Sequence, residues 1–587
     1  MKLVKLSTVG FGLIGLALSA QAAVKYIGVT SDSDVTTVIS LNPLSVNGNS
    51  TFDHDNNSGT AQVAVTGTSL TAAYGGTYTA ASGTEPATWS WEAANTPVLQ
   101  EIIFIRNGAL SIEAGSIVRG QPDSGSFNPG ALVIAAGAQI LASGSPTSPI
   151  IFTTASTTAM TAPATGATRA SGATPSFWDS APATAPKSPL IGSGWGGVLV
   201  LGNAPTNADR DGAGEQDYFN VTASTAAISN GTAVTGNRSA NNDDRFSIEG
   251  IPTLSNAFTG GHDRFGGFLS NENSGVLSYV SIRHGGANLT ANNEINGLTL
   301  GAVGAGTTIN NIEIWGNTDD GVEIFGGTVN LKNIAIFGVQ DDGLDLDVGY
   351  AGTVQFLFVV AGTNTDKLGE WDGSYQTETS INSLTYATGP AAVNRAPFAN
   401  ATIANATLVG NSSGAFSSGL HIRDQSSYRF VNSIVVNPTK LSTAGPIEID
   451  NRATDSYSTT SNYAAGRAYF KGVTFSSSTY TSASTLFDNG SSSNTVIRAE
   501  VVKAIYGNNM NDAVGFTNVP TGGALNANLE FDPKPSTIAD SAVLDETTVG
   551  ANASLTAVSY RGAFDAQEAN LWTADWTAAD AYGLIVK

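Results

Sequence analysis

Residues 317–347 read NTDDGVEIFGGTVNLKNIAIFGVQDDGLDLD. Two Asp-Asp-Gly triplets start at Asp319 and Asp341, an interval of about 22 residues. Apolar residues alternate with polar ones after each triplet. The same interval relates INNIEI, at 309–314, to LKNIAI, at 331–336. Self-similarity at a fixed period of roughly 20–50 residues is the sequence signature of a repeat architecture whose units stack on one another. The stretch therefore predicts a solenoid with about 22 residues in each coil.

The apolar pattern within each repeat indicates short strands rather than helices. Runs with period-two alternation, such as IEIW, VEIF, IAIF and LDLD, are separated by Gly, Asn and Asp. A propeller blade would need roughly 40–45 residues, so that fold is excluded. We predict an all-β chain that forms a right-handed parallel β-helix, with coils stacked at about 4.8 Å and a cap at each end. The predicted inward column is Ile312, Ile314, Val322, Ile324, Ile334, Ile336, Leu344 and Leu346.

Similar segments earlier in the chain extend the predicted solenoid. LSIEAGSI, at 110–117, aligns with LVIAAGAQI, at 132–140, which would place Gly115 over Gly137. Short runs such as FKGVTF and NTVIRAEVV predict further strands near the C-terminal end. The predicted organisation is a signal peptide (1–22), an N-terminal β-rich cap (23–97), the β-helix (98–436) with loop insertions near 154–189 and 208–242, an irregular Ser/Thr-rich end of the solenoid (437–540) and a C-terminal cap that closes the far end (541–587).

The N-terminal segment predicts export. MKLVKLSTVGFGLIGLALSAQA has two lysines, a short apolar run and an Ala-Gln-Ala cleavage site, which is the pattern of a secretory signal peptide. No later stretch reaches about 18 uninterrupted apolar residues, so no integral membrane segment is expected in the mature chain. We expect the protein in the extracellular space, at the cell surface or in the periplasm.

Charge and cysteine content exclude several classes of function. The chain has 48 acidic and 26 basic residues, a formal net charge of −22, and such a surface repels nucleic acid and attracts cations. It has no cysteine, which excludes disulfides, thiolate metal sites and a cysteine nucleophile. Hydrophobic residues make up 41% of the chain, which argues for a folded core rather than disorder.

Several segments in order resemble one known family. TWSWEAANTPVLQEIIFIRNGALSIEAGSIVRG, GWGGVLVLGNAP, FSIEGIP, the long stretch around the two triplets, and YRGAFDAQEANLWTADW are similar to secreted right-handed β-helix proteins of bacterial envelopes. These proteins are related in shape to pectin lyases. The similarity extends from about Thr88 to Trp576. The resemblance implies the β-helix fold and leaves the activity open.

Residues one coil apart stack in a β-helix, so the acidic residues of the two triplets should meet. Like charges about 5 Å apart repel by roughly 1–3 kcal/mol per pair at an intermediate dielectric constant, unless a cation intervenes or a proton is shared. Carboxylates and turn carbonyls are hard oxygen ligands, and Ca²⁺ takes six to eight of them. One interpretation is therefore a Ca²⁺ site formed by Asp319, Asp320, Glu323, Asp341, Asp342, Asp345 and Asp347.

A second interpretation is catalytic. NTD at 317–319 and QDD at 340–342 resemble the acid cluster of polygalacturonase-type glycoside hydrolases, which implies Asp342 as general acid, with Asp319 and Asp341 as bases. That family also has a Gly-His-Gly and an Arg-x-Lys motif, which are missing at the matching positions here. His421 and Arg423 follow much later in the sequence, and we expect them more than three coils away from Asp342. A lyase would need a basic residue near the cation, for which Lys367 and Arg423 are the candidates.

A third interpretation gives the triplets no chemistry, because Asp and Gly are turn formers and acidic residues are common on outward strand positions. Separate candidates for substrate contact are His284, Arg423, and Glu370 with Trp371, where an indole flanked by Glu370 and Asp372 is typical of a sugar-stacking platform. The prediction that unites these features is an exported scaffold or binding protein. It would engage an extracellular polysaccharide or envelope component with Ca²⁺ at the acid cluster. The alternative is a polysaccharide hydrolase or lyase that uses Asp319, Asp341 and Asp342.

Overall fold

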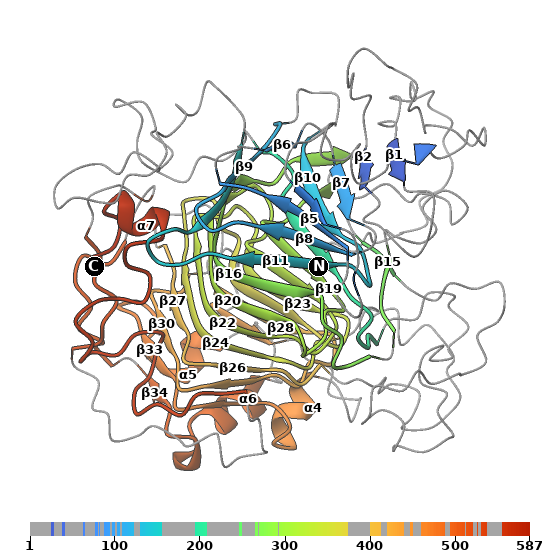
Figure 1. Ribbon diagram of the computed structural model, residues 1–587. Helices are drawn as coiled ribbons and strands as arrows, with labels where there is room; N and C mark the ends of the chain where they lie inside the picture. The colour runs from blue at the N-terminus through green and yellow to red at the C-terminus, as the bar shows by residue number, and fades with distance from the viewer. Residues whose placement is uncertain are drawn as a thin grey trace, which may run out of the picture.

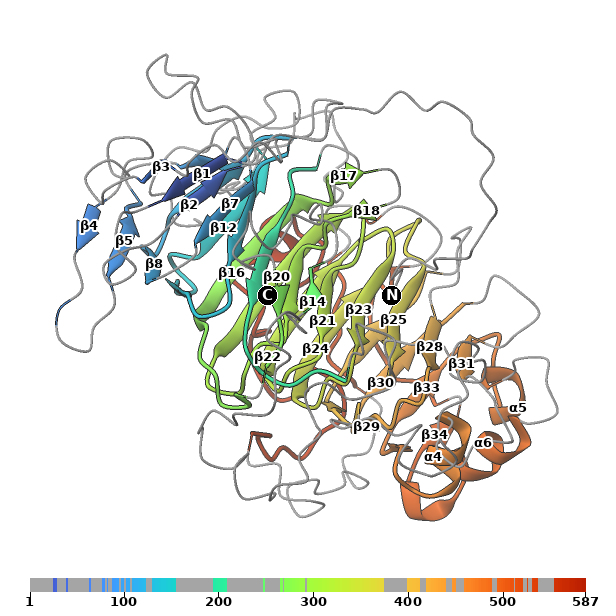
Figure 2. The same cartoon turned by 90° about the vertical axis from the view of Figure 1, so that its right-hand side faces the viewer.

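The computed structural model describes residues 25–28, 38–40, 63–64, 77–79, 82, 87–93, 97–154, 194–207, 246–248, 264–373, 399–439, 446–449, 459–487, 494–536 and 554–587, with short gaps inside several of these ranges. The strands lie side by side in chain order from the blue N-terminal end to the orange C-terminal end (Figure 2). The predicted signal peptide and, apart from Thr154, both predicted insertions lie outside the described residues. Among the described residues, no helix has the length and apolar character needed to cross a membrane.

One long sheet, sheet A, forms one wall of the solenoid. From β7 onward each of its strands pairs in parallel with the strand of the next coil. These strands are β7 (Ile102–Ile105), β10 (Ala131–Ile134), β13 (Val198–Leu201), β19 (Leu298–Gly301), β21 (Val322–Phe325), β23 (Asp342–Asp347), β25 (Lys367–Asp372), β28 (Gly419–Arg423) and β31 (Ile447–Ile449). At the N-terminal end, β1 (Lys25–Gly28) and β2 (Val38–Ser40) extend the sheet with antiparallel pairs.

A second sheet, sheet B, supplies the remaining walls (Figure 1). Its strands include β8 (Ala109–Ile112), β9 (Ile117–Gly120), β11 (Gln139–Ser143), β12 (Ile150–Thr154), β16 (Gly275–Gly285), β20 (Thr308–Asn317), β22 (Asn330–Phe337), β24 (Thr353–Val360), β26 (Thr402–Ala404), β27 (Thr407–Val409), β29 (Arg429–Val431), β30 (Ile434–Val436), β32 (Tyr469–Lys471) and β33 (Thr474–Ser476). Successive coils again pair in parallel. Long parallel sheets wound coil upon coil confirm the predicted β-helix.

A corner residue with positive φ interrupts the long strands of sheet B. It is Asn311 in β20 and Asn333 in β22, with φ of 52° and 58°. Asparagine tolerates this left-handed conformation because its short polar side chain forms local hydrogen bonds. Asn333 Nδ2 donates to Asn311 Oδ1 at 3.1 Å, so the corner is also connected from one coil to the next.

The coil length varies more than the sequence suggests. The predicted step holds between β20 and β22 and between β21 and β23. The alignment of Leu110 with Leu132 is wrong, because Leu110 pairs with Ile140 in sheet B whereas Leu132 pairs with Ile103 in sheet A. Gly115 and Gly137 therefore belong to different turns. The segments 110–117 and 132–140 have similar sequences although they occupy different positions within the coil.

The core lies inside the coils and matches the predicted column. All eight predicted inward residues, from Ile312 to Leu346, are at most 1% exposed. They belong to one continuous apolar cluster that runs from Trp89 to Val501. At the far end three helices complete this cluster: α4 (Thr459–Ala464), α5 (Ala483–Leu486) and α6 (Asn494–Val501). The strand predicted from NTVIRAEVV is wrong, because these residues form α6, whose buried Ile497 and Val501 lie one helical turn apart.

The C-terminal segment packs along the side of the solenoid rather than over its far end. Trp315, Phe337 and Phe358 point outward from sheet B and would form an exposed apolar stripe. The C-terminal segment covers this stripe: Tyr582 lies 5.7 Å from Trp315 and Phe564 lies 4.8 Å from Phe358 between ring centroids. The buried carboxylate of Glu313 also accepts the N–H groups of Ala578 and Ala579 at 2.8 and 3.0 Å, where α7 (Ala578–Ala581) begins.

Candidate metal-binding face

Acidic side chains stack on the outer face of sheet A. Strand alternation sends Val322, Leu344 and their neighbours inward, so the residues between them point outward. Glu323 pairs in register with Asp345, and Asp345 with Glu370. With the acids of the adjoining turns and strands they form what we call the acid ladder: Asp319, Asp320, Glu323, Asp341, Asp342, Asp345, Asp347, Asp366, Glu370 and Asp372. The predicted stacking of the two triplets is therefore confirmed.

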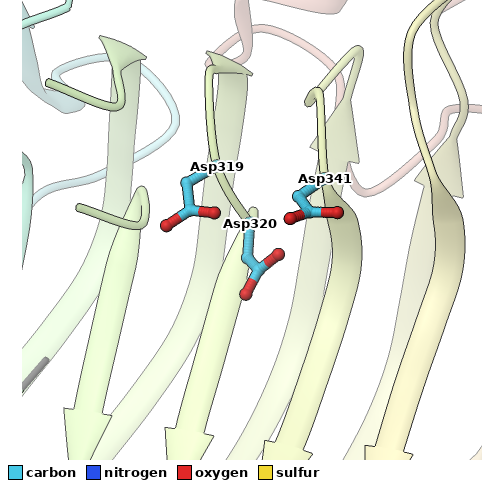
Figure 3. A group of neighbouring side chains, drawn as sticks. All are labelled: Asp319, Asp320 and Asp341. Atoms are coloured by element: carbon cyan, nitrogen blue, oxygen red, sulfur yellow. The ribbon is translucent and has the colours of Figure 1, made fainter. Parts of the chain in front are cut away.

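The turns before β21 and β23 bring the first three carboxylates together. Asp319 and Asp320 lie on one turn and Asp341 on the turn of the next coil (Figure 3). A carboxylate oxygen from each lies within 4.8 Å of the other two. Asp320 Oδ1 accepts the N–H of Asp342 at 2.8 Å, which joins the two turns. Asn317 Nδ2 donates to the carbonyl oxygen of Asp320 at 2.9 Å and thereby fixes the first turn.

Three further triads continue the ladder toward β25. Each has one oxygen per residue within 4.8 Å of the others: Asp320 with Glu323 and Asp345, Asp341 with Asp342 and Asp366, and Asp342 with Asp345 and Glu370. A cation at typical Ca²⁺–oxygen distances of about 2.3–2.6 Å can touch several oxygens at this separation. The donor set is all oxygen, which suits Ca²⁺ or Mg²⁺ rather than a thiolate-seeking metal.

These carboxylates are buried, which changes their acidity. The exposed fraction is 7% for Asp320, 3% for Asp342 and 0% for Asp347. Burial raises the pKa of Asp320, and the nearby carboxylates of Asp319 and Asp345 raise it further. Burial likewise raises the pKa of Asp342 and of Asp347. Like charges held in a buried site without compensation favour protonation or a bound cation.

Several buried oxygens in the described part of this face accept no hydrogen bond. They include Asp342 Oδ1 and Asp347 Oδ2, and the side-chain oxygens of Asn296 and Asn317 nearby. The amide of Asn296 is held in place because its Nδ2 donates to Glu323 Oε2. Buried polar atoms are almost always paired, so unpaired oxygens beside carboxylates are positions where a positively charged ligand could bind.

Positive charge enters the ladder at its C-terminal end. Lys367 Nζ lies 2.7 Å from Asp366 Oδ2, 3.2 Å from Glu370 Oε1 and 3.8 Å from Asp342 Oδ1. One coil later, Arg423 Nε donates to Asp372 Oδ1 at 2.7 Å and Nη2 to Glu370 Oε2 at 3.0 Å. Burial raises the pKa of Glu370, whereas the hydrogen bond from His421 and the charges of Lys367 and Arg423 lower it.

The structure changes the expected positions of three predicted site residues. His421 and Arg423 lie two coils from Asp342, whereas the sequence predicted more than three. The prediction was wrong because the coil that joins β25 to β28 contains many more residues than the coil that joins β23 to β25. Trp371 is 1% exposed and packs inside the solenoid, 5.2 Å from Phe430 and 6.4 Å from Tyr428 between ring centroids. The prediction of a sugar-stacking platform is therefore wrong for Trp371, because neither face of the ring is accessible.

His284, another predicted residue for substrate contact, is also buried. It is 3% exposed, has φ of 58° and stands near the end of β16, next to Gly285, which pairs with Asn317 of the following coil.

One ladder residue, Asp366, was not singled out from the sequence. The strand register would have revealed it. Asp342 pairs with Lys367, so Asp366 lies one coil after Asp341 of the second triplet. The coil between these two acids is longer than the coil before it, and this concealed the match.

The spacing of the carboxylates bears on the possible chemistry. Inverting glycosidases hold their two carboxyl groups roughly 6.5–9.5 Å apart, and retaining enzymes roughly 5–5.5 Å apart. The triad of Asp341, Asp342 and Asp366 places oxygens within 4.8 Å. Oxygens this close can coordinate one cation together, and their separation is shorter than that of an inverting pair.

The stacked coils define a parallel β-helix protein. Residues 230–577, more than half of the chain, match the family model described as a pectate-lyase-like β-helix domain, and the chain belongs to this family. No curated protein and no solved structure matches the chain.

Proposed function

We propose that this chain is an exported β-helix binding protein whose acid ladder holds a divalent cation, Ca²⁺, and through it engages an extracellular polysaccharide or envelope component. The observation that carries the proposal is the convergence of carboxylates in overlapping triads, two of which share Asp342. A buried oxygen of Asp342, and one of Asp347 farther along β23, accept no hydrogen bond. A divalent cation offsets such a concentration of negative charge more fully than water can in a buried site.

Binding is favoured over lyase chemistry by the state of the basic residues. A lyase needs a base that can give up its proton. Burial lowers the pKa of Arg423, but ion pairs with Asp372 and Glu370 raise it by more. Burial also lowers the pKa of Lys367, and the carboxylates of Asp342, Glu370 and Asp366 again raise it by more. In the metal-free chain both side chains therefore stay charged and act as counter-ions.

The fold supports the polymer part of the proposal. β-Helix domains often bind polysaccharides, and successive strands of sheet A present the ladder along the direction in which the coils stack. A cation held at this face could contact both the ladder and the oxygens of a long polymer.

Calorimetric titration of the chain from Ala23 onward, freed of metal by chelator, tests the cation part of the proposal. We expect saturable Ca²⁺ binding that Asp345→Asn weakens strongly, whereas Asp575→Asn, an exposed control, leaves it unchanged. The polymer part is tested by retention of the protein on immobilised acidic and neutral polysaccharides with Ca²⁺ and with chelator. Retention that ignores both Ca²⁺ and the ladder variant would contradict the proposal.

A polysaccharide hydrolase or lyase that uses Asp319, Asp341 and Asp342 is the second candidate. The observation in its favour is the register, which places His421 and Arg423 on the same face, two coils from Asp342. Release of reducing ends or unsaturated products from a polysaccharide panel decides between the two. Turnover that disappears in Asp342→Asn would establish the enzyme, and absence of turnover together with Ca²⁺-dependent retention would establish the binding protein.

A further inference from the structure

Lys367 occupies the position in the ladder where a third acid would otherwise stack. It is the first residue of β25 and pairs in register with Asp342, so its side chain leaves the sheet on the acidic face. Its ammonium group contacts a member of each of two triads, Asp366 in one and Glu370 in the other, at 2.7 and 3.2 Å. Asp342 belongs to both triads. The ammonium therefore contacts both of the triads that share Asp342.

The contact with Asp342 is incomplete. Lys367 Nζ lies 3.8 Å from Asp342 Oδ1, which is beyond hydrogen-bond distance. That oxygen accepts no hydrogen bond, although the residue is only 3% exposed. A buried carboxylate oxygen without a partner is a position where a second ligand gains free energy. The ammonium offsets the charge of Asp342 but leaves its oxygen available.

Lys367 is held less rigidly than Arg423, although the two side chains are similarly exposed, at 18% and 25%. The flexible lysine stem gives the ammonium a path to water. Arg423 makes two hydrogen bonds of 2.7 and 3.0 Å to two different carboxylates, a geometry that a rigid guanidinium group keeps. Lys367 and Arg423 therefore differ in how firmly they are held.

We propose that Lys367 is an internal counter-ion that competes with the divalent cation: it neutralises the ladder in the metal-free protein and moves out to solvent when the cation binds between Asp342 and Glu370. This inference rests on the proposed function, because it assumes that the ladder binds a cation. Its consequence is that Lys367 sets the affinity. A site that must displace its own ammonium responds only to high concentrations of the cation, such as those outside the cell.

The first test is Ca²⁺ titration of Lys367→Met beside the wild type. Lys367→Met has no ammonium to displace from its place 3.8 Å from Asp342, so it should bind Ca²⁺ at least about tenfold more tightly than the wild type. The matched control is Lys503→Met, which removes a lysine that pairs at 2.6 Å with Glu500 of α6, away from sheet A. Equal or weaker binding by Lys367→Met, with a wild type that binds, overturns the inference and leaves the proposed function intact. If neither protein binds Ca²⁺, both fail.

The second test uses the wild-type chain and so does not depend on the folding of a variant. Lysine acetylation by an N-hydroxysuccinimide ester, followed by mass spectrometry, reports how accessible each ammonium group is. Lys367 should react several-fold faster in saturating Ca²⁺ than in chelator, whereas Lys503 should react at the same rate in both. An unchanged or slower reaction of Lys367 at saturating Ca²⁺ means that the ammonium does not leave, and contradicts the inference.

Discussion

Replacing Asp342 by asparagine tests whether repulsion among the carboxylates of the acid ladder outweighs their attraction to Lys367. Asp342 is 3% exposed and lies near the carboxylates of Glu370, Asp341 and Asp345. Each like-charge pair about 5 Å apart costs roughly 1–3 kcal/mol at an intermediate dielectric constant. The variant loses this repulsion but also loses the attraction to Lys367 at 3.8 Å. In chelator we therefore expect Asp342→Asn to be more stable than the wild type by about 1 kcal/mol.

Calcium should reverse that order. A ligand at about 100 times its Kd stabilises the folded state by roughly 2.7 kcal/mol. The variant lacks a charged ligand shared by two triads, so it should gain much less. The assay is urea unfolding of both proteins, in chelator and in excess Ca²⁺, with the free energy of unfolding taken from midpoint and slope. Asp575→Asn is the control, because Asp575 is half exposed and pairs with Lys587 at the surface.

The crossing of the two stabilities is what makes this prediction specific. A turn-forming role alone would make Asp342→Asn lose the same free energy with and without Ca²⁺. That result would refute the assignment of the ladder as a cation site, and so would a variant that responds to Ca²⁺ as strongly as the wild type.

Three further outcomes follow from the structure. The raised pKa of Asp347 means that, in chelator, the folded chain takes up a proton more readily than the unfolded chain. The wild type should therefore gain stability relative to Asp347→Asn as pH falls from neutral toward the ordinary carboxyl range, and lose that advantage as pH rises. Urea unfolding midpoints of both proteins across this pH range measure the difference. Trp371→Ala should cost about 3–5 kcal/mol of stability and leave polysaccharide retention at low temperature unchanged, because the indole lies in the core. Phe358→Ala should cost about 3–5 kcal/mol and increase proteolysis within 554–587, because it removes the ring on which Phe564 packs, and equal protection in both proteins would contradict this packing.

The fold was predictable because two neighbouring coils have the same length. Between Asp319 and Asp341 the constant step puts like residues over like residues, and period-two alternation then separates core from face. The inward column from Ile312 to Leu346 follows from that register alone. Where insertions lengthen the coils, the sequence interval no longer measures distance along the solenoid. This is why His421 and Arg423 were expected too far from Asp342 and why Asp366 was not singled out.

Side-chain direction was the second limit. Trp371 stands between Glu370 and Asp372 in the sequence, but strand alternation sends these two carboxylates outward and the indole inward. The same rule explains the C-terminal segment. Trp315, Phe337 and Phe358 occupy outward positions, so sheet B needed an apolar cover along its side. Composition alone could not reveal that need, because it follows from the alternation of three separate strands.

The cation site is tested most directly by crystals of the chain grown with Ca²⁺ and, in parallel, with Tb³⁺, whose anomalous scattering locates the ion. The structure predicts an anomalous peak on the outer face of sheet A, with oxygens of Asp342 and Glu370 among its ligands at about 2.3–2.6 Å in the Ca²⁺ form. Lys367 Nζ should then have moved away from Asp342. A ladder that holds only water and the ammonium of Lys367, in crystals saturated with either ion, would contradict the central claim.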